Sequence, residues 1–221
     1  MLKDYSGALQ ADGYEGYNQF EHRAGISLLG CFAHARRYFE KASNQDNQRA
    51  AWMLTAIQKL YLVEREAREA REAREAGLSY TDRYQLRQEK SVSLLAEIKE
   101  WLQQNGTKVL PASLVGKAIN YTVGMWPRLE RYISDGRFEI DNNLIENAIR
   151  PIAVGRKNYP FAGSHEAAKN AALIYSIMAT AKYHDVNPAV YLEYVFQSIL
   201  DYPFHKLADL LPQNWKTQSQ N

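Results

Sequence analysis

The sequence has a single cysteine, Cys31, among its 221 residues, which excludes an internal disulfide and a cysteine-rich zinc module. It also has no apolar run close to the roughly 20 residues that a membrane-spanning helix needs, and its start does not resemble a signal peptide. An excess of one charge sign is missing as well, since the net charge is only +2. Nucleic-acid binding would therefore have to come from local basic patches. Because a signal peptide and a membrane-spanning run are not recognisable, we expect a cytoplasmic protein without a membrane partner.

What the sequence does contain begins with an α/β pattern. Residues 6–12 read as a short strand that ends at Asp12, where Gly13 predicts a turn. A second apolar stretch over 26–32 runs into a helical segment over 33–42. Strand, turn, strand and helix in this order are typical of an α/β unit.

The pattern changes to long helices between about residues 45 and 102. Four successive Arg-Glu-Ala triplets over 65–76 place opposite charges four residues apart, as in Arg65 and Glu69. A period of three spreads charge around the helix and leaves only alanine for burial. We expect a solvated helix or helical hairpin arm there.

Further helices are expected beyond a linker at 106–111. One covers 113–133 with a possible bend at Pro127, a mostly buried one covers 166–184, and another starts at Asn187.

The most informative segment is 141–151, Asp-Asn-Asn-Leu-Ile-Glu-Asn-Ala-Ile-Arg-Pro. Asp141 or Asn142 offers a helix cap. Helical spacing then places four polar side chains along one face: Asn142, Asn143, Glu146 and Arg150. The opposite side suits burial through Leu144, Ile145, Ala148 and Ile149. The segment could hold a metal ion near phosphate, or it could be an ordinary capped surface helix with one ion pair.

Five stretches in order resemble the transposases of the insertion sequence 66 family. They are 9–17 (LQADGYEGY), 31–39 (CFAHARRYF), 140–150 (IDNNLIENAIR), 155–164 (GRKNYPFAGS) and 210–215 (LLPQNW). The resemblance extends over nearly the whole chain and is weakest in the Arg-Glu-Ala stretch.

Such transposases resemble the class with a ribonuclease-H-like core and an Asp-Asp-Glu metal triad. The resemblance assigns Asp12 to the second acid and Glu146 to the third, both as catalytic residues and metal ligands. In a complete site two Mg²⁺ or Mn²⁺ ions would activate the attacking oxygen and stabilise the departing one.

The expected fold is an α/β fragment, mostly α-helical, with an incomplete ribonuclease-H-like core and a large helical insertion. We expect a partial core with the fourth and fifth strands (1–42), the insertion (43–133), the catalytic-Glu helix with core helices (134–185) and a C-terminal helical tail (186–221).

The first Asp of the triad has no match in this sequence. The only acid before Asp12 is Asp4, which an extended chain would place roughly 26 Å away. Relative to the family, the chain is therefore expected to be the C-terminal portion of a transposase from a split, frameshifted or decayed gene. It would be inactive in strand transfer alone. It would be stable only with a complementing upstream transposase fragment as partner or as a homo-oligomer.

Several residues are candidates for supporting roles. Two basic pairs are expected to contact DNA phosphates, Arg36 with Arg37 and Arg156 with Lys157, and Arg150 would orient Glu146 or touch phosphate. His34, Asn142 and Asn143 would assist, although a lone histidine can equally be a hydrogen-bonded core residue.

Three functions remain open. The first is a transposase (fragment) for DNA transposition by metal-dependent phosphodiester cleavage and strand transfer, with DNA as its partner. The second is a non-catalytic DNA-binding or assembly fragment that regulates a full-length transposase. The third is a helical interaction protein without a DNA role, which would leave the Asp12 and Glu146 motifs unexplained.

Overall fold

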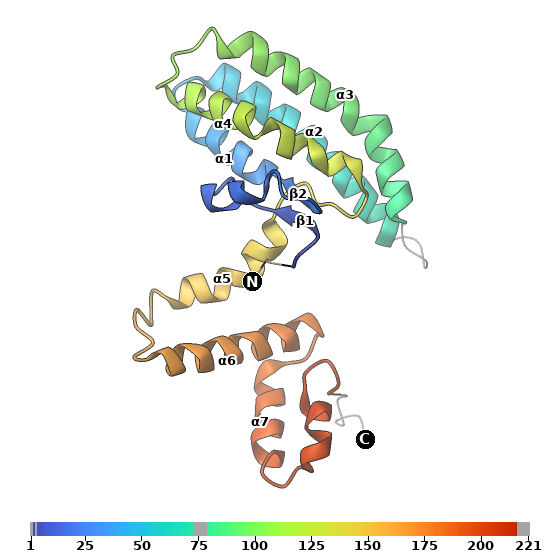
Figure 1. The fold of residues 1–221 in the computed structure, drawn as a ribbon, viewed down its shortest axis with the longest axis vertical. Coiled ribbons are helices and arrows are strands. Elements are labelled where there is room, and N and C mark those ends of the chain that lie inside the picture. The colour runs from blue at the N-terminus through green and yellow to red at the C-terminus, as the bar shows by residue number, and fades with distance from the viewer. Residues whose placement is uncertain (1, 3, 73–78, 216–221) are drawn as a thin grey trace. The chain divides into compact units, whose positions relative to one another are not determined.

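The computed structural model describes residues 2, 4–72 and 79–215 and is mostly helical, with two short strands (Figure 1). The chain divides into two compact units, Met1–Leu144 and Ile145–Asn221. Each unit is described by itself.

The first unit begins with the two predicted strands. Strand β1 (Gly7–Gln10) pairs in parallel with β2 (Ile26–Leu29), so that Gly7 lies opposite Ile26 and Gln10 opposite Leu29. A 3-10 helix, η1 (Glu15–Phe20), lies in the connection between them. The parallel pairing confirms the strands that the sequence predicts, although β1 ends two residues before Asp12.

Four helices of the first unit follow β2. Helix α1 (Phe32–Ala42) leads to the long helices α2 (Asn47–Glu72) and α3 (Tyr80–Gly106), which lie side by side and antiparallel (Figure 1). Helix α4 (Leu114–Leu129) packs on α1, and η2 (Glu130–Ser134) continues from it. Helices α2 and α3 therefore form a helical hairpin, as the sequence pattern allows. The helix expected over 113–133 loses its regular α form soon after Pro127.

Helix-cap residues and apolar spacing explain these boundaries. Ser79 accepts from the backbone N–H of Asp82 and forms a capping box at the start of α3, and Ser113 accepts from Gly116 in α4. On α1 the buried residues recur at helical spacing: Phe32, Ala35, Phe39 and Ala42. They join a core made with α2, α3 and α4.

The second unit is a chain of helices. It contains most of α5 (Asn143–Gly155), then α6 (His165–Tyr183), α7 (Pro188–Ser198) and the 3-10 helix η3 (Phe204–Leu210). Asn187 caps α7 by accepting from the N–H of Ala189, as the Asn-Pro signal predicts. The hydroxyl of Tyr191 donates to the carbonyl oxygen of Leu210 at 2.8 Å and ties η3 to α7.

The burial predicted for α5 and α6 is wrong. On α5, Leu144, Ile145 and Ile149 are 75%, 56% and 50% exposed. On α6 Ala181 is buried, whereas Leu173 and Ile174 are 61% and 58% exposed. An apolar stripe indicates which side of a helix favours cover, but burial also requires another element to provide that cover.

The Arg-Glu-Ala arm behaves as predicted where it is described. The Arg65–Glu69 pair measures 3.5 Å, and both side chains are more than half exposed. The pairs that involve Arg71, Glu72 or Glu75 lie outside the described side chains. Within residues 2, 4–72 and 79–215, no helix is both long and apolar enough to cross a membrane.

Candidate active-site residues

Asp12 lies just beyond the carboxyl end of β1, with an exposed side chain. Its Oδ1 accepts a hydrogen bond from the backbone N–H of Tyr14 at 3.0 Å, which fixes a tight turn. Gly13 in that turn has φ +93°, a left-handed conformation that favours glycine. The turn therefore holds the Asp12 carboxylate at the end of the strand, where it faces solvent.

A tyrosine pair that the sequence analysis missed supports this turn from α4 and α1. The Tyr121 hydroxyl donates to the Asp12 carbonyl oxygen at 2.7 Å, and its ring stacks on Tyr38 with centroids 4.4 Å apart. Burial raises the pKa of Tyr121, and the nearby Cys31, Tyr38 and Asp12 side chains add to the increase. The positive charge of Arg37 acts in the opposite direction. Tyr121 is 109 residues from Asp12 in the chain, so local sequence carried no signal for this contact.

The candidate residues of α1 lie at the same end of the sheet as Asp12, because β1 and β2 are parallel and α1 follows β2. His34 Nδ1 lies 3.2 Å from the Cys31 sulfur, and His34 Nε2 lies 3.4 Å from a guanidinium nitrogen of Arg37. Arg36 forms an ion pair with Glu40 at 3.1 Å on the exposed side of the helix. His34 therefore links the start of α1 to Arg37.

Cys31 precedes α1 and is fully buried. Burial raises the pKa of its thiol, although the backbone amides of Asn142, His34 and Ala33 act in the opposite direction. The thiol is therefore neutral at physiological pH, in keeping with the inert role that its apolar surroundings predict. The side-chain oxygen of Asn142 is also buried and has no hydrogen-bond partner among the described residues.

The junction of β2 and α1 is joined to the segment that follows α4. The Gln10 side-chain amide donates to the carbonyl oxygens of Gly30 and Glu139, at 3.0 and 2.9 Å. The backbone N–H of Gly30 donates to Arg128, and that of Phe32 donates to Ile140. Segments about a hundred residues apart thus share backbone hydrogen bonds next to the sheet.

Of the two caps that the sequence offers for α5, Asp141 and Asn142, the structure uses Asp141. Its Oδ1 accepts from the backbone N–H of Asn143 at 3.0 Å, and its Oδ2 accepts from the Asn143 side-chain amide at 2.8 Å. The Tyr61 hydroxyl of α2 also donates to Oδ2, at 2.7 Å. The Asp141 carboxylate thus accepts three hydrogen bonds, and two of them come from Asn143 at the start of α5.

Glu146 lies in the first turn of α5 and is half-buried, and Arg150 lies one turn later and is exposed. An acid in the first turn of a helix is stabilised by the helix dipole. Helix α5 ends at Gly155, and the exposed side chains of Arg156 and Lys157 occupy the turn that follows. The predicted spacing of Asn143, Glu146 and Arg150 on one helix is confirmed, whereas Asn142 lies just before it.

Asp12 belongs to the first unit and Glu146 to the second, so their meeting at one metal site stays a prediction. Among the described residues, no group of three or more histidine, cysteine, aspartate or glutamate side chains could hold a metal ion. Both acids supply oxygen ligands, which suit Mg²⁺ and Mn²⁺.

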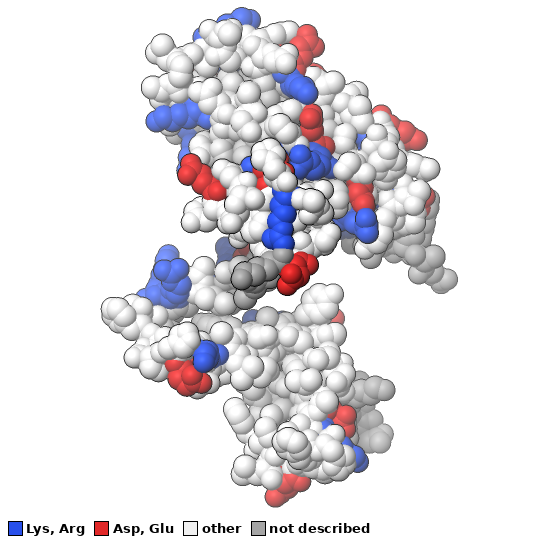
Figure 2. Space-filling model, viewed as in Figure 1, with Lys and Arg blue, Asp and Glu red and all other residues white. Residues whose placement is uncertain are grey.

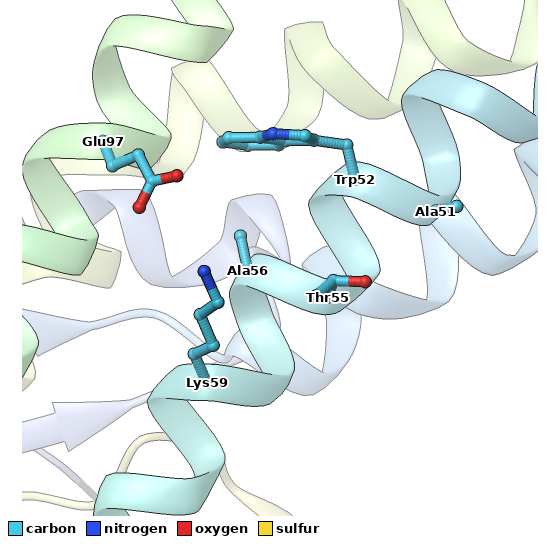
Figure 3. A pocket seen from close by; sticks show the side chains of 6 residues that line it. All are labelled: Ala51, Trp52, Thr55, Ala56, Lys59 and Glu97. Carbon is cyan, nitrogen blue, oxygen red and sulfur yellow. The ribbon is translucent and has the colours of Figure 1, made fainter.

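A shallow hollow of about 410 Å³ lies away from these residues, between α2 and α3 (Figure 3). Trp52 forms one wall, and Lys59 and Glu97 extend into the hollow from the two helices. Trp52 stacks on Trp101 with ring centroids 4.8 Å apart, so its main contact is structural.

Comparisons with known proteins place these residues in context. The sequence profile described as "Transposase IS66 family" matches residues 1–170, and that described as "IS66 C-terminal element" matches residues 176–213. The chain is also similar to three uncharacterized proteins of Sinorhizobium fredii, named y4hP, y4qI and y4jD, at 34%, 34% and 30% identity. These alignments cover 99%, 97% and 98% of the chain but 41%, 40% and 42% of the relatives. The chain thus spans about two fifths of the length of these relatives, and no solved structure matches it.

Proposed function

Since the chain belongs to the Transposase IS66 family, we propose that it acts in DNA transposition by metal-dependent phosphodiester cleavage and strand transfer. Asp12 and Glu146 are two of the three carboxylates of the active site in this proposal. The observation that carries it is the position of Asp12, exposed at the carboxyl end of a strand in a parallel pair, inside the matched residues 1–170. A ribonuclease-H-like core is part of the same proposal.

The donor set fits a hard divalent cation such as Mg²⁺ or Mn²⁺. Asp12 holds its turn through Oδ1 while its side chain stays exposed, which leaves room for coordination. A bound divalent cation would activate a water or a DNA 3′-hydroxyl and stabilise the departing oxygen. Glu146 would add a second carboxylate from α5, and Asn142 and Asn143 lie beside it at the start of that helix.

The DNA backbone would be held by basic side chains near each acid. Arg37 lies on α1, at the same sheet end as Asp12, while Arg150, Arg156 and Lys157 lie on or just after α5. On the face drawn in Figure 2, basic and acidic side chains of the first unit are interspersed, without one continuous basic stripe. Binding would therefore depend on a few local contacts, to which Arg36 adds a charge shared with Glu40.

The third carboxylate would come from outside these 221 residues, on an upstream transposase fragment. The alignment with about two fifths of each relative supports this step. The exposed Leu144, Ile145 and Ile149 side chains of α5 also provide apolar surface for such a partner to cover.

The test is a Mn²⁺-dependent nicking and strand-transfer assay with and without the co-expressed upstream segment. We expect activity with that segment, and its loss by at least about 10³-fold in Asp12→Asn and in Glu146→Gln. Glu166→Gln is the matched control, because Glu166 also lies in the first turn of an exposed helix and is not a candidate ligand. Full activity of Glu146→Gln would overturn the proposal.

A second candidate is a DNA-binding or assembly fragment that regulates a full-length transposase through mixed complexes. The exposed apolar side chains of α5 and α6 favour it, since they could pair with the equivalent helices of a longer relative. In that case the chain would bind DNA and suppress transposition by the longer protein, and Glu146→Gln would suppress it equally well.

A further inference from the structure

The helical insertion makes a dense set of polar contacts with one short segment, residues 135–142, which we name the connector. The connector joins η2 to α5 and ends at the residues that cap α5. Nothing in the Arg-Glu-Ala pattern of the insertion predicts such contacts.

Two arginines of α3 hold the connector through its carbonyl oxygens. Arg87 donates to Asp135 at 2.9 Å and to Phe138 at 2.7 Å, as well as to Tyr132 just before the connector at 2.8 Å. Arg83 donates to the carbonyl oxygen of Gly136 at 3.2 Å and to both carboxylate oxygens of Glu139, at 2.8 and 2.7 Å.

Glu64 of α2 faces both arginines. It accepts from Arg87 at 2.8 Å through both of its oxygens and from Arg83 at 2.7 Å. The negative charge of the Glu64 carboxylate holds the guanidinium groups of Arg83 and Arg87 against the connector. A single acid from α2 therefore fixes the backbone path that leads to α5.

The last of these contacts joins α2 to Asp141. It comes from Tyr61, which lies three residues before Glu64 on α2. Oδ2 of Asp141 receives the Tyr61 hydroxyl and the Asn143 side-chain amide. Two donors on one oxygen set the rotation of the carboxylate, so that Oδ1 points at the backbone N–H of Asn143. That N–H belongs to the first residue of α5, three positions before Glu146.

We propose that Tyr61 is a positioning residue for the candidate catalytic Glu146, acting through Asp141 and the first turn of α5. This inference rests on the proposed function. Its physical basis is that a displacement of about 1 Å at a reacting group costs roughly 10²-fold in rate, and the start of a helix sets where a first-turn side chain lies. Helix α2 would then contribute to the chemistry through this contact.

The Tyr61 hydroxyl is suited to this role because it remains a donor. Burial and the hydrogen bond to Asp141 raise the pKa of the phenol well above its ordinary value, so it stays protonated at working pH. Tyr61→Phe removes the donor and keeps the ring that packs against the core.

The first test is hydrogen exchange on the chain itself. In Tyr61→Phe we expect the amide of Asn143, which bonds to Asp141, and those of the next helical turn, residues 147–149, to exchange about tenfold faster, with little change in the melting temperature. Asp141→Asn should have the same effect, and the double variant should add nothing more. Tyr84→Phe is the matched control, because Tyr84 lies exposed on α3. Unchanged exchange in Tyr61→Phe would overturn the inference.

The second test separates positioning from mere stability in the Mn²⁺-dependent reaction with the upstream segment. Tyr61→Phe should lower kcat about tenfold and leave the KM for DNA unchanged, and Tyr84→Phe should lower neither. A rise in KM with kcat intact would contradict positioning. If Glu146→Gln stays active, the proposed function fails. If Glu146→Gln is inactive and Tyr61→Phe has normal kcat, only the positioning role of Tyr61 fails.

Discussion

Glu64 and Arg87 form a two-point ion pair in which the Nε–Oε1 and Nη2–Oε2 distances are both 2.8 Å. The Arg87 side chain is fully buried and that of Glu64 is 9% exposed. The guanidinium also lies 4.9 Å from the centroid of the Tyr132 ring. This pair joins α2 and α3 to the connector and is the most buried ion pair among the described residues.

Removal of one partner of this pair should strongly destabilise the first unit. We expect Glu64→Ala to lower the free energy of unfolding by about 3–5 kcal/mol, because the buried Arg87 loses its counter-charge and Arg83 keeps only Glu139. Urea denaturation followed by circular dichroism measures the change. Glu66→Ala is the control, because its pair with Lys90 is about half exposed and should contribute less than about 1 kcal/mol. Equal effects of the two substitutions would contradict this account.

The same carboxylate should make stability depend on acid pH. Burial acts to raise the pKa of Glu64, but the hydrogen bonds and charges of Arg87 and Arg83 outweigh it and hold the pKa below its ordinary value of 4.5. A depressed folded-state pKa means that the unfolded state binds more protons, so this stabilisation is complete above 4.5 and is lost as the pH falls through the folded-state value.

The measurement is the unfolding free energy between about pH 3 and 6 for the protein and for Glu64→Gln. The difference in unfolding free energy between the two proteins should shrink as the pH falls, because Glu64 becomes protonated and loses its stabilising charge. Asp46 and Asp135, whose pKa values are also lowered, contribute equally to both proteins and cancel in the difference. A constant difference across this range would rule out the assignment to Glu64.

Two glycines of α4 should respond to alanine in opposite directions. A Cβ at Gly116 would overlap the carbonyl oxygen of Leu110, whereas a Cβ at Gly124 would meet nothing within 4 Å. Gly124→Ala should therefore stabilise the protein by about 0.5–1 kcal/mol through helix propensity, and Gly116→Ala should destabilise it. Thermal unfolding of both variants checks the pair, and stabilisation by Gly116→Ala would show that the Leu110 segment moves away easily.

The basic turn after α5 should contribute to DNA affinity without reading sequence. In a variant that combines Arg156→Ala with Lys157→Ala, the slope of log affinity against log salt should become shallower by about 0.9 for each phosphate that is no longer neutralised. Filter binding to duplexes of different sequence over a salt series measures it. Lys99→Ala, which removes an exposed pair with Glu130, should leave the slope unchanged. An unchanged slope in the double variant would remove these residues from the DNA interface.

Local signals in the sequence predicted much of this fold. The apolar spacing of α1, the capping residue Asn187 and the turn at Gly13 act over a few residues, and the structure confirms each. Asp141 was likewise a predictable cap, because its oxygen needs only the N–H two residues later.

Contacts across long sequence separations were not predictable. Arg87 lies in a charged helical stretch that looks solvated, and its burial depends on Glu64, 23 residues away, and on carbonyl oxygens of the connector. The exposure of α5 and α6 was missed for a related reason, since an apolar pattern does not specify its partner. The meeting of Asp12 and Glu146 remains a prediction.

The backbone bonds that join Gly30 to Arg128 and Phe32 to Ile140 bring the two ends of the insertion together. The loop-closure entropy rises only with the logarithm of the loop length. The number of residues in the Arg-Glu-Ala arm therefore has only a weak effect on the stability of the sheet region.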